Sequence, residues 1–78
     1  MRAFHIAVDG FDPMIACAET LAKARYFAFK SAHEAGYTTV TFPRITGRRA
    51  PDLDAWAQQQ KEPRLVAEYY ARELGVPV

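Results

Sequence analysis

The chain has 78 residues, of which 50% are hydrophobic and 24% are charged. This length allows one hydrophobic core, and the composition is too apolar for a disordered chain. The formal net charge of +1 excludes a strongly basic nucleic-acid module. The single cysteine excludes a disulfide scaffold and a zinc site built on four thiolates. We therefore predict one domain over residues 1–78, with no cofactor and no metal.

The sequence carries no sign of a membrane protein. No stretch approaches the roughly 18 apolar residues of a membrane span. The beginning of the sequence, Met-Arg-Ala-Phe-His, lacks the apolar core of a signal peptide. We therefore expect a cytoplasmic chain with no membrane partner.

The first predicted elements are the two strands of a hairpin. Residues 4–8 alternate between apolar and other side chains, which is typical of a half-buried strand. An Asp-Gly dipeptide follows at once and predicts a turn. Residues 14–18 form a short apolar run that we interpret as the return strand. The alternative for this run is a helix that begins near Pro13 with Asp12 as its cap.

A helix is the clearest prediction, over residues 21–35. Thr20 is a suitable N-cap, and Gly36 is suited to the left-handed position that ends a helix. At 100° per residue, small or apolar side chains share one narrow face that can lie close to a sheet. These residues are Leu21, Ala24, Ala28, Ala32 and Ala35. Arg25 projects from the edge of this face, and Phe27 falls on the polar side.

Residues 37–42 are rich in Thr, Val and aromatic side chains, so we predict a third strand that Pro43 ends. The basic segment 44–49 is either a loop or a fourth short strand. A short helix is expected from Pro51, carrying Leu53, Trp56 and Ala57. A last helix is expected from Pro63 to Leu74, where Gly75 ends it.

These elements predict an α+β fold. One long helix packs on a small, mostly antiparallel sheet of three or four strands, and two short helices follow near the C-terminus. Residues 1–50 form the hairpin, helix and strand of the core, and residues 51–78 form a helical C-terminal segment.

Two pairs of side chains have the composition of a catalytic site. His5 and Asp9 are placed to share one face, where a carboxylate could orient an imidazole, but a polar pair beside a turn is the favoured interpretation. Cys17 and His33 are residue types that can act as a nucleophile and its general base. A lone cysteine in an apolar run is, however, more often a small buried hydrophobic residue. Asp9 and Asp12 are interpreted as turn formers, since a calcium loop needs more oxygen ligands. We expect no enzyme.

The near-zero net charge conceals a polarised chain. Residues 1–50 hold seven basic and four acidic side chains, a net of +3, and residues 51–78 hold three basic and five acidic ones, a net of −2. Arg44, Arg48 and Arg49 cluster in the first part, and arginine suits bidentate contact with phosphate or carboxylate. One interpretation is a nucleic-acid contact, helped by Lys30 or by the ring of Tyr37.

The favoured alternative is that these arginines pair within the fold with acidic residues of the C-terminal part. The candidate carboxylates are those of Asp52, Asp54 and Glu62. Exposed intramolecular pairs of this kind are common and need no function.

Aromatic side chains supply candidate anchors for a protein interface. They are Phe27, Trp56, Tyr69 and Tyr70. We expect Trp56 in the core, whereas Phe27 and Tyr70 fit a core or an interface equally well. Together with the basic residues, these give the predicted partner-binding set: Arg44, Arg48, Arg49, Phe27, Lys30 and Tyr70.

Residues 18–37 read A-E-T-L-A-K-A-R-Y-F-A-F-K-S-A-H-E-A-G-Y, and residues 44–51 read R-I-T-G-R-R-A-P. This combination resembles a class of short uncharacterised proteins of bacteriophages and prophages. They have a strand or hairpin, an A-x-T-x-x-K-A-R-Y helix ending in A-G-Y, and a basic segment closer to R-x-R-R. The resemblance covers residues 4–51. Gly47 departs from the basic pattern and weakens the expectation of a regular strand there.

The resemblance implies a phage origin and a bacterial host cell more than an activity. Small non-enzymatic phage proteins often inhibit host machinery by covering a protein surface, and the most concrete example is an anti-CRISPR protein. We therefore expect an interaction protein, monomeric or homodimeric, that binds a host protein or ribonucleoprotein complex. The alternative is a weak nucleic-acid-binding accessory protein that uses Arg44, Arg48 and Arg49.

Overall fold

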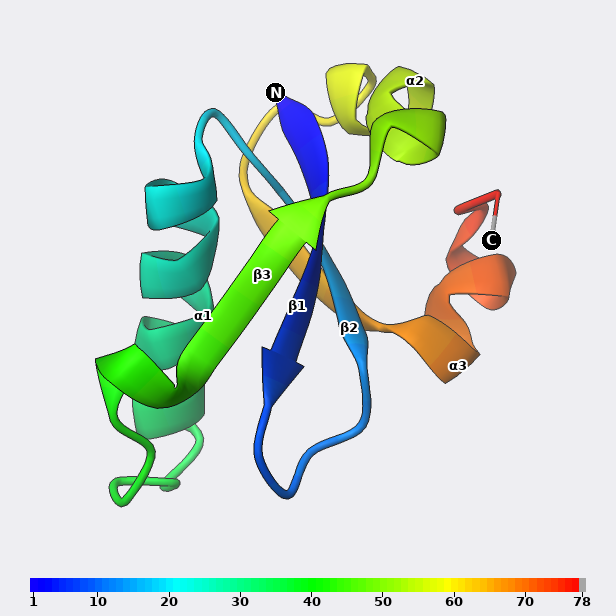
Figure 1. The fold of residues 1–78 in the computed structure, drawn as a ribbon. Helices are drawn as coiled ribbons and strands as arrows, with labels where there is room; N and C mark the ends of the chain where they lie inside the picture. Colours follow the sequence, from blue (N-terminus) through cyan, green and yellow to red (C-terminus); the bar gives the residue numbers. More distant parts are fainter. Residues whose placement is uncertain (78) are drawn as a thin grey trace.

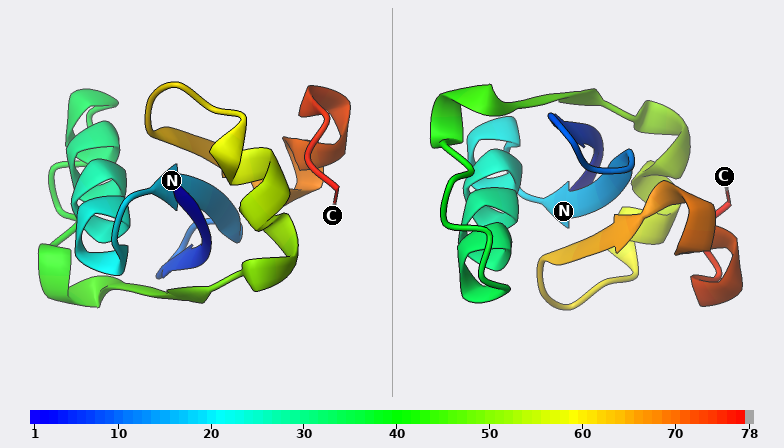
Figure 2. Two further views of the ribbon diagram at one scale, coloured as in Figure 1. Left: turned by 90° about the horizontal axis from the view of Figure 1, so that it is seen from above. Right: turned by 90° about the horizontal axis from the view of Figure 1, so that it is seen from below.

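A computed structural model describes residues 1–77 of the chain. Its sheet consists of β1 (Arg2–Val8), β2 (Met14–Ala18), β3 (Ile45–Arg49) and β4 (Arg64–Ala67). The strands lie in the order β3-β1-β2-β4, and every neighbouring pair is antiparallel (Figure 1). Helix α1 (Leu21–Glu34) covers one face, and the short helices α2 (Asp54–Gln58) and α3 (Glu68–Ala71) lie toward the other (Figure 2). The predicted α+β fold is confirmed.

The N-terminal hairpin is formed as predicted. Gly10 adopts a left-handed φ of 85°, and the N–H of Phe11 donates to the carbonyl of Val8 at 3.0 Å, which closes the turn. The register places Phe4 opposite Ala16. Residues 14–18 are therefore the return strand, and the alternative of a helix beginning near Pro13 is wrong.

Each face of the sheet supports its own apolar cluster, because successive side chains of a strand point to opposite faces. The cluster under α1 consists of Phe4, Ile6, Val8, Ala16, Ala18, Ala24, Ala28 and Ile45. The cluster on the other face consists of Ala3, Ile15, Cys17, Ala50, Leu53, Trp56, Ala57, Val66, Ala71 and Val76. The central strands β1 and β2 thus contribute to both clusters. Trp56 is in the core, as expected.

Helix α1 begins and ends where its local signals predict. The Thr20 hydroxyl accepts a hydrogen bond from the backbone N–H of Lys23 at 3.1 Å, and Gly36 has a left-handed φ of 97°. Of the five residues on the predicted apolar face, Ala24 and Ala28 are buried, and their small side chains let the helix lie close to the sheet. The two ends of that face are more open, since both Leu21 and Ala35 are exposed.

The predicted third strand over residues 37–42 is wrong. These residues form turns, and a 3-10 turn, η1 (Phe42–Arg44), follows. The His33 ring Nε2–H donates to the carbonyl of Val40 at 2.7 Å, so this segment is held against α1. The strand that pairs with β1 is instead β3, which runs regularly through Gly47. The basic segment is therefore a strand, despite its glycine.

The C-terminal segment is only partly as predicted. The 3-10 turn η2 (Pro51–Leu53) and helix α2 confirm the expected short helix. Residues 64–67 were predicted as helix but form β4, because the backbone groups of β2 at Ile15 and Cys17 need a strand partner. The remaining helix is short, comprising α3 and the 3-10 turn η3 (Arg72–Leu74), and it ends at Gly75 with a φ of 82°.

Candidate interaction site

The three clustered arginines have three different environments, and Arg49 is a structural residue. Its guanidinium forms a bidentate ion pair with Asp54, with an Nη1–Oδ1 distance of 3.0 Å, and also donates to the carbonyl of Ala3 at 3.2 Å. The hydrogen bonds from Arg49 and from the N–H of Ala3 lower the pKa of the Asp54 carboxyl, and Asp54 raises the pKa of Arg49. This pair ties β3 to α2. The expected pairing with the acidic C-terminal part is confirmed for this arginine.

Arg44 and Arg48 remain on the surface. Arg44 lies 3.7 Å from Asp9 in a pair whose side chains are both largely exposed, so this pair contributes little to stability. Arg48 is exposed and makes no ion pair or hydrogen bond with the described part of the chain. It is the cross-strand neighbour of His5, and Glu68 lines the same hollow, of about 350 Å³. Arg48 is therefore available to a partner.

Strand β3 is an open edge of the sheet. The N–H of Ala50 donates to the carbonyl of Ala3 at 2.9 Å, which makes these residues a hydrogen-bonded pair of the antiparallel ladder. Hydrogen-bonded and non-hydrogen-bonded pairs alternate along such a ladder. The register therefore directs the N–H and C=O groups of Gly47 and Arg49 away from β1. No element of residues 1–77 lies outside β3 (Figure 2).

One end of this edge is closed by Arg25. Its Nε–H donates to the carbonyl of Ile45 at 2.7 Å, and its Nη2 donates to the carbonyl of Phe42 at 3.3 Å. The guanidinium also lies 4.4 Å from the centre of the Phe42 ring. The N–H of Ile45 donates to the carbonyl of Phe42 as well. Open backbone groups are therefore confined to the second half of β3.

The space above Gly47, beside these open groups, is filled by neighbouring side chains. A Cβ atom at this position would lie 2.8 Å from the Cδ1 atoms of both Ile6 and Leu21. The glycine therefore lets the N-terminus of α1 approach the strand closely. Leu21 is 36% exposed, so its side chain forms an apolar rim at the edge of the sheet.

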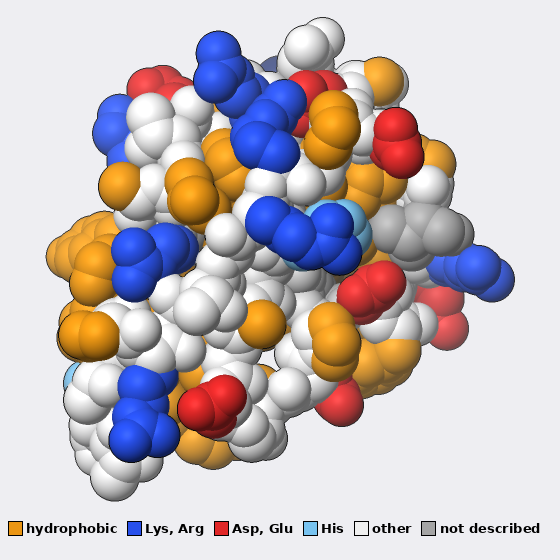
Figure 3. All heavy atoms as spheres, viewed as in Figure 1, with side chains coloured by type: hydrophobic (Ala, Val, Ile, Leu, Met, Phe, Trp, Pro, Cys, Tyr) orange, Lys and Arg blue, Asp and Glu red, His pale blue; other side chains and the backbone are white. Residues whose placement is uncertain are grey.

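Aromatic side chains continue the surface from β3 onto α1. The Phe29 ring contacts the Phe42 ring edge-on at 6.1 Å between centroids, and it stacks with Tyr26 at 6.5 Å. Tyr26 is 58% exposed. Figure 3 shows Lys and Arg side chains spread over the face on which β3 lies, with a hydrophobic area over α1 beside them. We use the name β3 surface for the open edge of β3, including the Arg48 side chain, together with the exposed side chains of Leu21 and Tyr26 on α1.

The other predicted partner-binding residues lie elsewhere. Phe27 and Lys30 follow Arg25 by two and five residues, which places them roughly 160° and 140° around the helix from it. They therefore face away from β3, and Lys30 forms a weak pair with Glu34 at 3.9 Å. Tyr70 lies on α3, on the other side of the sheet, and is 46% exposed. The structure does not gather the predicted set into one site.

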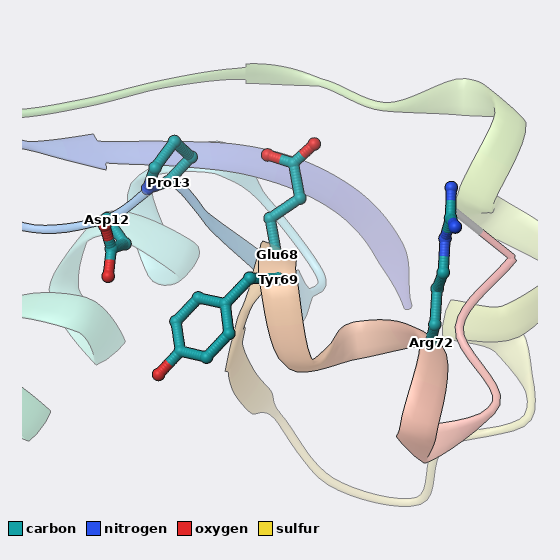
Figure 4. A pocket seen from close by; sticks show the side chains of 5 residues that line it. All are labelled: Asp12, Pro13, Glu68, Tyr69 and Arg72. Carbon is teal, nitrogen blue, oxygen red and sulfur yellow. The ribbon is translucent and has the colours of Figure 1, made fainter.

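A larger hollow beside α3 has no converging groups. It has a volume of about 570 Å³ and is lined by Asp12, Pro13, Glu68, Tyr69 and Arg72. Figure 4 shows that the Glu68 and Tyr69 side chains point in different directions and that Arg72 stands apart from both. The N–H of Glu68 donates to the carbonyl of Pro13 at 2.8 Å, so this region links α3 to the hairpin. Its geometry indicates a structural contact.

The two candidate catalytic pairs are not assembled. Cys17 is buried in the cluster opposite α1, whereas His33 belongs to α1, so the sheet separates them. Burial raises the pKa of the Cys17 thiol, and its Sγ–H donates to the carbonyl of Glu62 at 3.7 Å, which keeps it unreactive. Asp9 faces Arg44 and not His5. Residues 1–77 contain no cluster of three or more potential metal ligands.

Sequence reasoning identified Arg48 but missed the features that leave β3 as an open edge of the sheet. The one available signal was Gly47, since a glycine inside a strand often marks a close approach. Leu21 forms the apolar rim and Arg25 closes one end of the edge only because α1 lies close to β3. No local sequence pattern predicts that contact.

Comparisons with protein-family models, characterised proteins and solved structures found no match to this chain. Across residues 1–77, no helix has the length and apolarity needed to cross a membrane.

Proposed function

We propose that this protein is a small, non-enzymatic interaction protein that binds a protein surface through β3. One observation carries the proposal: Arg48 is exposed, has no ion-pair or hydrogen-bond partner among residues 1–77, and lies on a strand whose outer edge no strand of that part of the chain pairs with. Arginine and tyrosine are among the residues that contribute most to protein interfaces, and Tyr26 lies exposed on the adjoining helix. The resemblance to phage proteins supports a host complex as the target, most concretely a CRISPR–Cas effector.

The binding function is tested by affinity capture from a host lysate. Arg48→Glu reverses the charge in the open half of β3, and Lys61→Glu is the matched control. Lys61 is exposed and precedes β4, which lies at the opposite edge of the sheet. We expect one stoichiometric protein to be captured by the wild type and by Lys61→Glu, and lost with Arg48→Glu. Equal capture by all three baits, or no stoichiometric protein, contradicts the proposal.

The anti-CRISPR form of the proposal is tested by plaque counts. The chain is expressed in hosts whose CRISPR–Cas systems, one type per host, target an infecting phage. We expect plaque formation to recover in one of these hosts with the wild type and with Lys61→Glu, but not with Arg48→Glu. If plaque counts recover in none of the hosts, the target is a different host complex.

A nucleic-acid contact through the arginines is the second candidate, favoured by the exposed guanidiniums of Arg44 and Arg48. Arg49 is held by Asp54, so roughly two phosphate contacts are available. On a single strand, two contacts give a log–log salt slope of about −1.4, or roughly a 7-fold loss of affinity between 50 and 200 mM salt. A gel shift with a 20-nucleotide single strand tests this. No shift at 50 mM salt excludes this candidate.

A further inference from the structure

We infer that the partner supplies an extended acidic segment that adds to the sheet as a fifth strand beside β3. This inference rests on the proposed function and specifies how the β3 surface binds. The added strand would pair with the backbone groups of Gly47 and Arg49, place a carboxylate opposite Arg48, and lay an apolar side chain against the exposed side chain of Leu21.

The backbone groups call for a polypeptide strand and not for another ligand. The N–H and C=O groups of Gly47 and Arg49 alternate along the open half of β3, and a neighbouring strand offers the matching pattern. A phosphate backbone can accept from the N–H groups but cannot donate to the carbonyls. The closed end at Ile45, held by Arg25, confines the added strand to the second half of β3.

The side chains on β3 define the chemistry of the added strand. Residues directly opposite each other on antiparallel strands share a face. The residue opposite Gly47 would therefore point toward α1 and lie against Leu21, whose exposed side chain offers an apolar contact. Its neighbour opposite Arg48 would lie on the other face, beside a guanidinium that no side chain of residues 1–77 pairs with. The predicted segment alternates carboxylate and apolar side chains.

Charge also argues against a second copy of this chain as the occupant. Pairing β3 with itself would bring together two edges that each carry the exposed guanidiniums of Arg44 and Arg48. Like charges on adjacent strands destabilise pairing, and charged side chains on edge strands prevent self-association. An acidic strand meets the same edge with charge complementarity.

The inference is tested by NMR titration of the full chain with a capped heptapeptide of alternating Glu and Val. We expect the amide signals of Gly47 and Arg49 to shift on binding, and Arg48→Glu to weaken binding roughly 10-fold or more. Lys61→Glu should bind as the wild type does. A peptide with Lys in place of Glu should not bind.

A second peptide separates strand addition from simple charge attraction. It keeps every side chain but carries N-methyl groups on the backbone nitrogens that would pair with β3. We expect it to lose binding, because methylation removes the donors. Binding equal to that of the unmethylated peptide overturns the inference, as does binding that shifts amides of β4 and leaves β3 unchanged.

The outcomes also distinguish this inference from the proposed function. If the lysate partner is captured in an Arg48-dependent way but neither its acidic segments nor the heptapeptide shift the β3 amides, strand addition is wrong and protein binding stands. If a 20-nucleotide single strand shifts the Gly47 amide and the heptapeptide does not, the occupant is a nucleic acid. If the β3 amides shift with protein concentration and sedimentation gives a dimer, the occupant is a second copy. Each of the last two results overturns the inference.

Discussion

Replacing Gly47 by alanine should destabilise the fold, although alanine is ordinarily the better residue in regular structure. The added Cβ would meet Cδ1 of Ile6 and of Leu21 at 2.8 Å and the backbone carbonyl of His5 at 3.1 Å. Leu21 is at the surface and can move, but Ile6 is 1% exposed and the carbonyl belongs to the central strand. Overpacking of this kind costs about 1–3 kcal/mol. Alanine also reduces the conformational entropy of the unfolded chain, which offsets about 0.4–1 kcal/mol of that cost.

We therefore expect Gly47→Ala to lower the free energy of unfolding by about 1–2 kcal/mol. At about 2.1 cal/mol/K per residue, the unfolding entropy of this chain is about 160 cal/mol/K, so Tm should fall by about 6–12 °C. Thermal and urea unfolding followed by circular dichroism measure both quantities.

A double-mutant cycle identifies the clash as the cause. Ile6→Val removes the Cδ1 atom that the new Cβ would meet, and by itself it should cost about 0.5–1.5 kcal/mol. In the Gly47→Ala background, the same change should cost less than that or be stabilising. Additive effects, within about 0.5 kcal/mol, would refute the reasoning, and so would a Gly47→Ala protein as stable as the wild type.

The remaining predictions concern the apolar cluster on the face opposite α1 and the internal ion pair. The buried Cys17 thiol should react with dithiobisnitrobenzoate at pH 8 only after denaturation, and stoichiometric reaction of the folded protein would contradict its burial. Because Arg49 lowers the pKa of Asp54 in the folded state, the pair stabilises the fold above the unfolded pKa of about 3.9 and loses this contribution as the pH falls through the lower folded value. The urea midpoint of the wild type should thus fall more steeply between pH 5 and pH 2 than that of Asp54→Asn, and equal slopes would disprove the linkage. Trp56→Ala should cost about 3–5 kcal/mol, a large share of the stability of so small a domain, and a wild-type Tm would place Trp56 outside the core.

Local signals sufficed where an element is stabilised by its own neighbours in sequence. The hairpin turn needs a residue with positive φ, and Gly10 provides it. Helix α1 begins at the N-cap Thr20 and ends before Gly36, and its alanine face is narrow enough to pack on the sheet. Each of these requirements is met within a few residues, so the pattern of the sequence is enough to predict them.

Local signals failed where a distant partner decides the conformation. Residues 37–42 have the composition of a strand, but the place beside β1 is taken by Ile45–Arg49, and His33 holds Val40 against the helix. Residues 64–67 follow a proline that suits a helix start, but β2 lacks a partner on that side and they become β4. Backbone hydrogen bonding between segments far apart in the chain outweighs local preference in both places.

The sequence by itself determined that this is one α+β domain, that its helix packs through small residues, and that its positive charge gathers in residues 44–49. Only the tertiary structure decided what those arginines do. The chain turns after β3 and brings Asp54, at the start of α2, to the guanidinium of Arg49, while Arg48 lies opposite His5 and has no ion-pair or hydrogen-bond partner among residues 1–77. The strand order then leaves β3 at the edge, because nothing in residues 1–77 pairs with its outer side. Pairing is a property of two segments, and for that reason the open edge appears only in the folded chain.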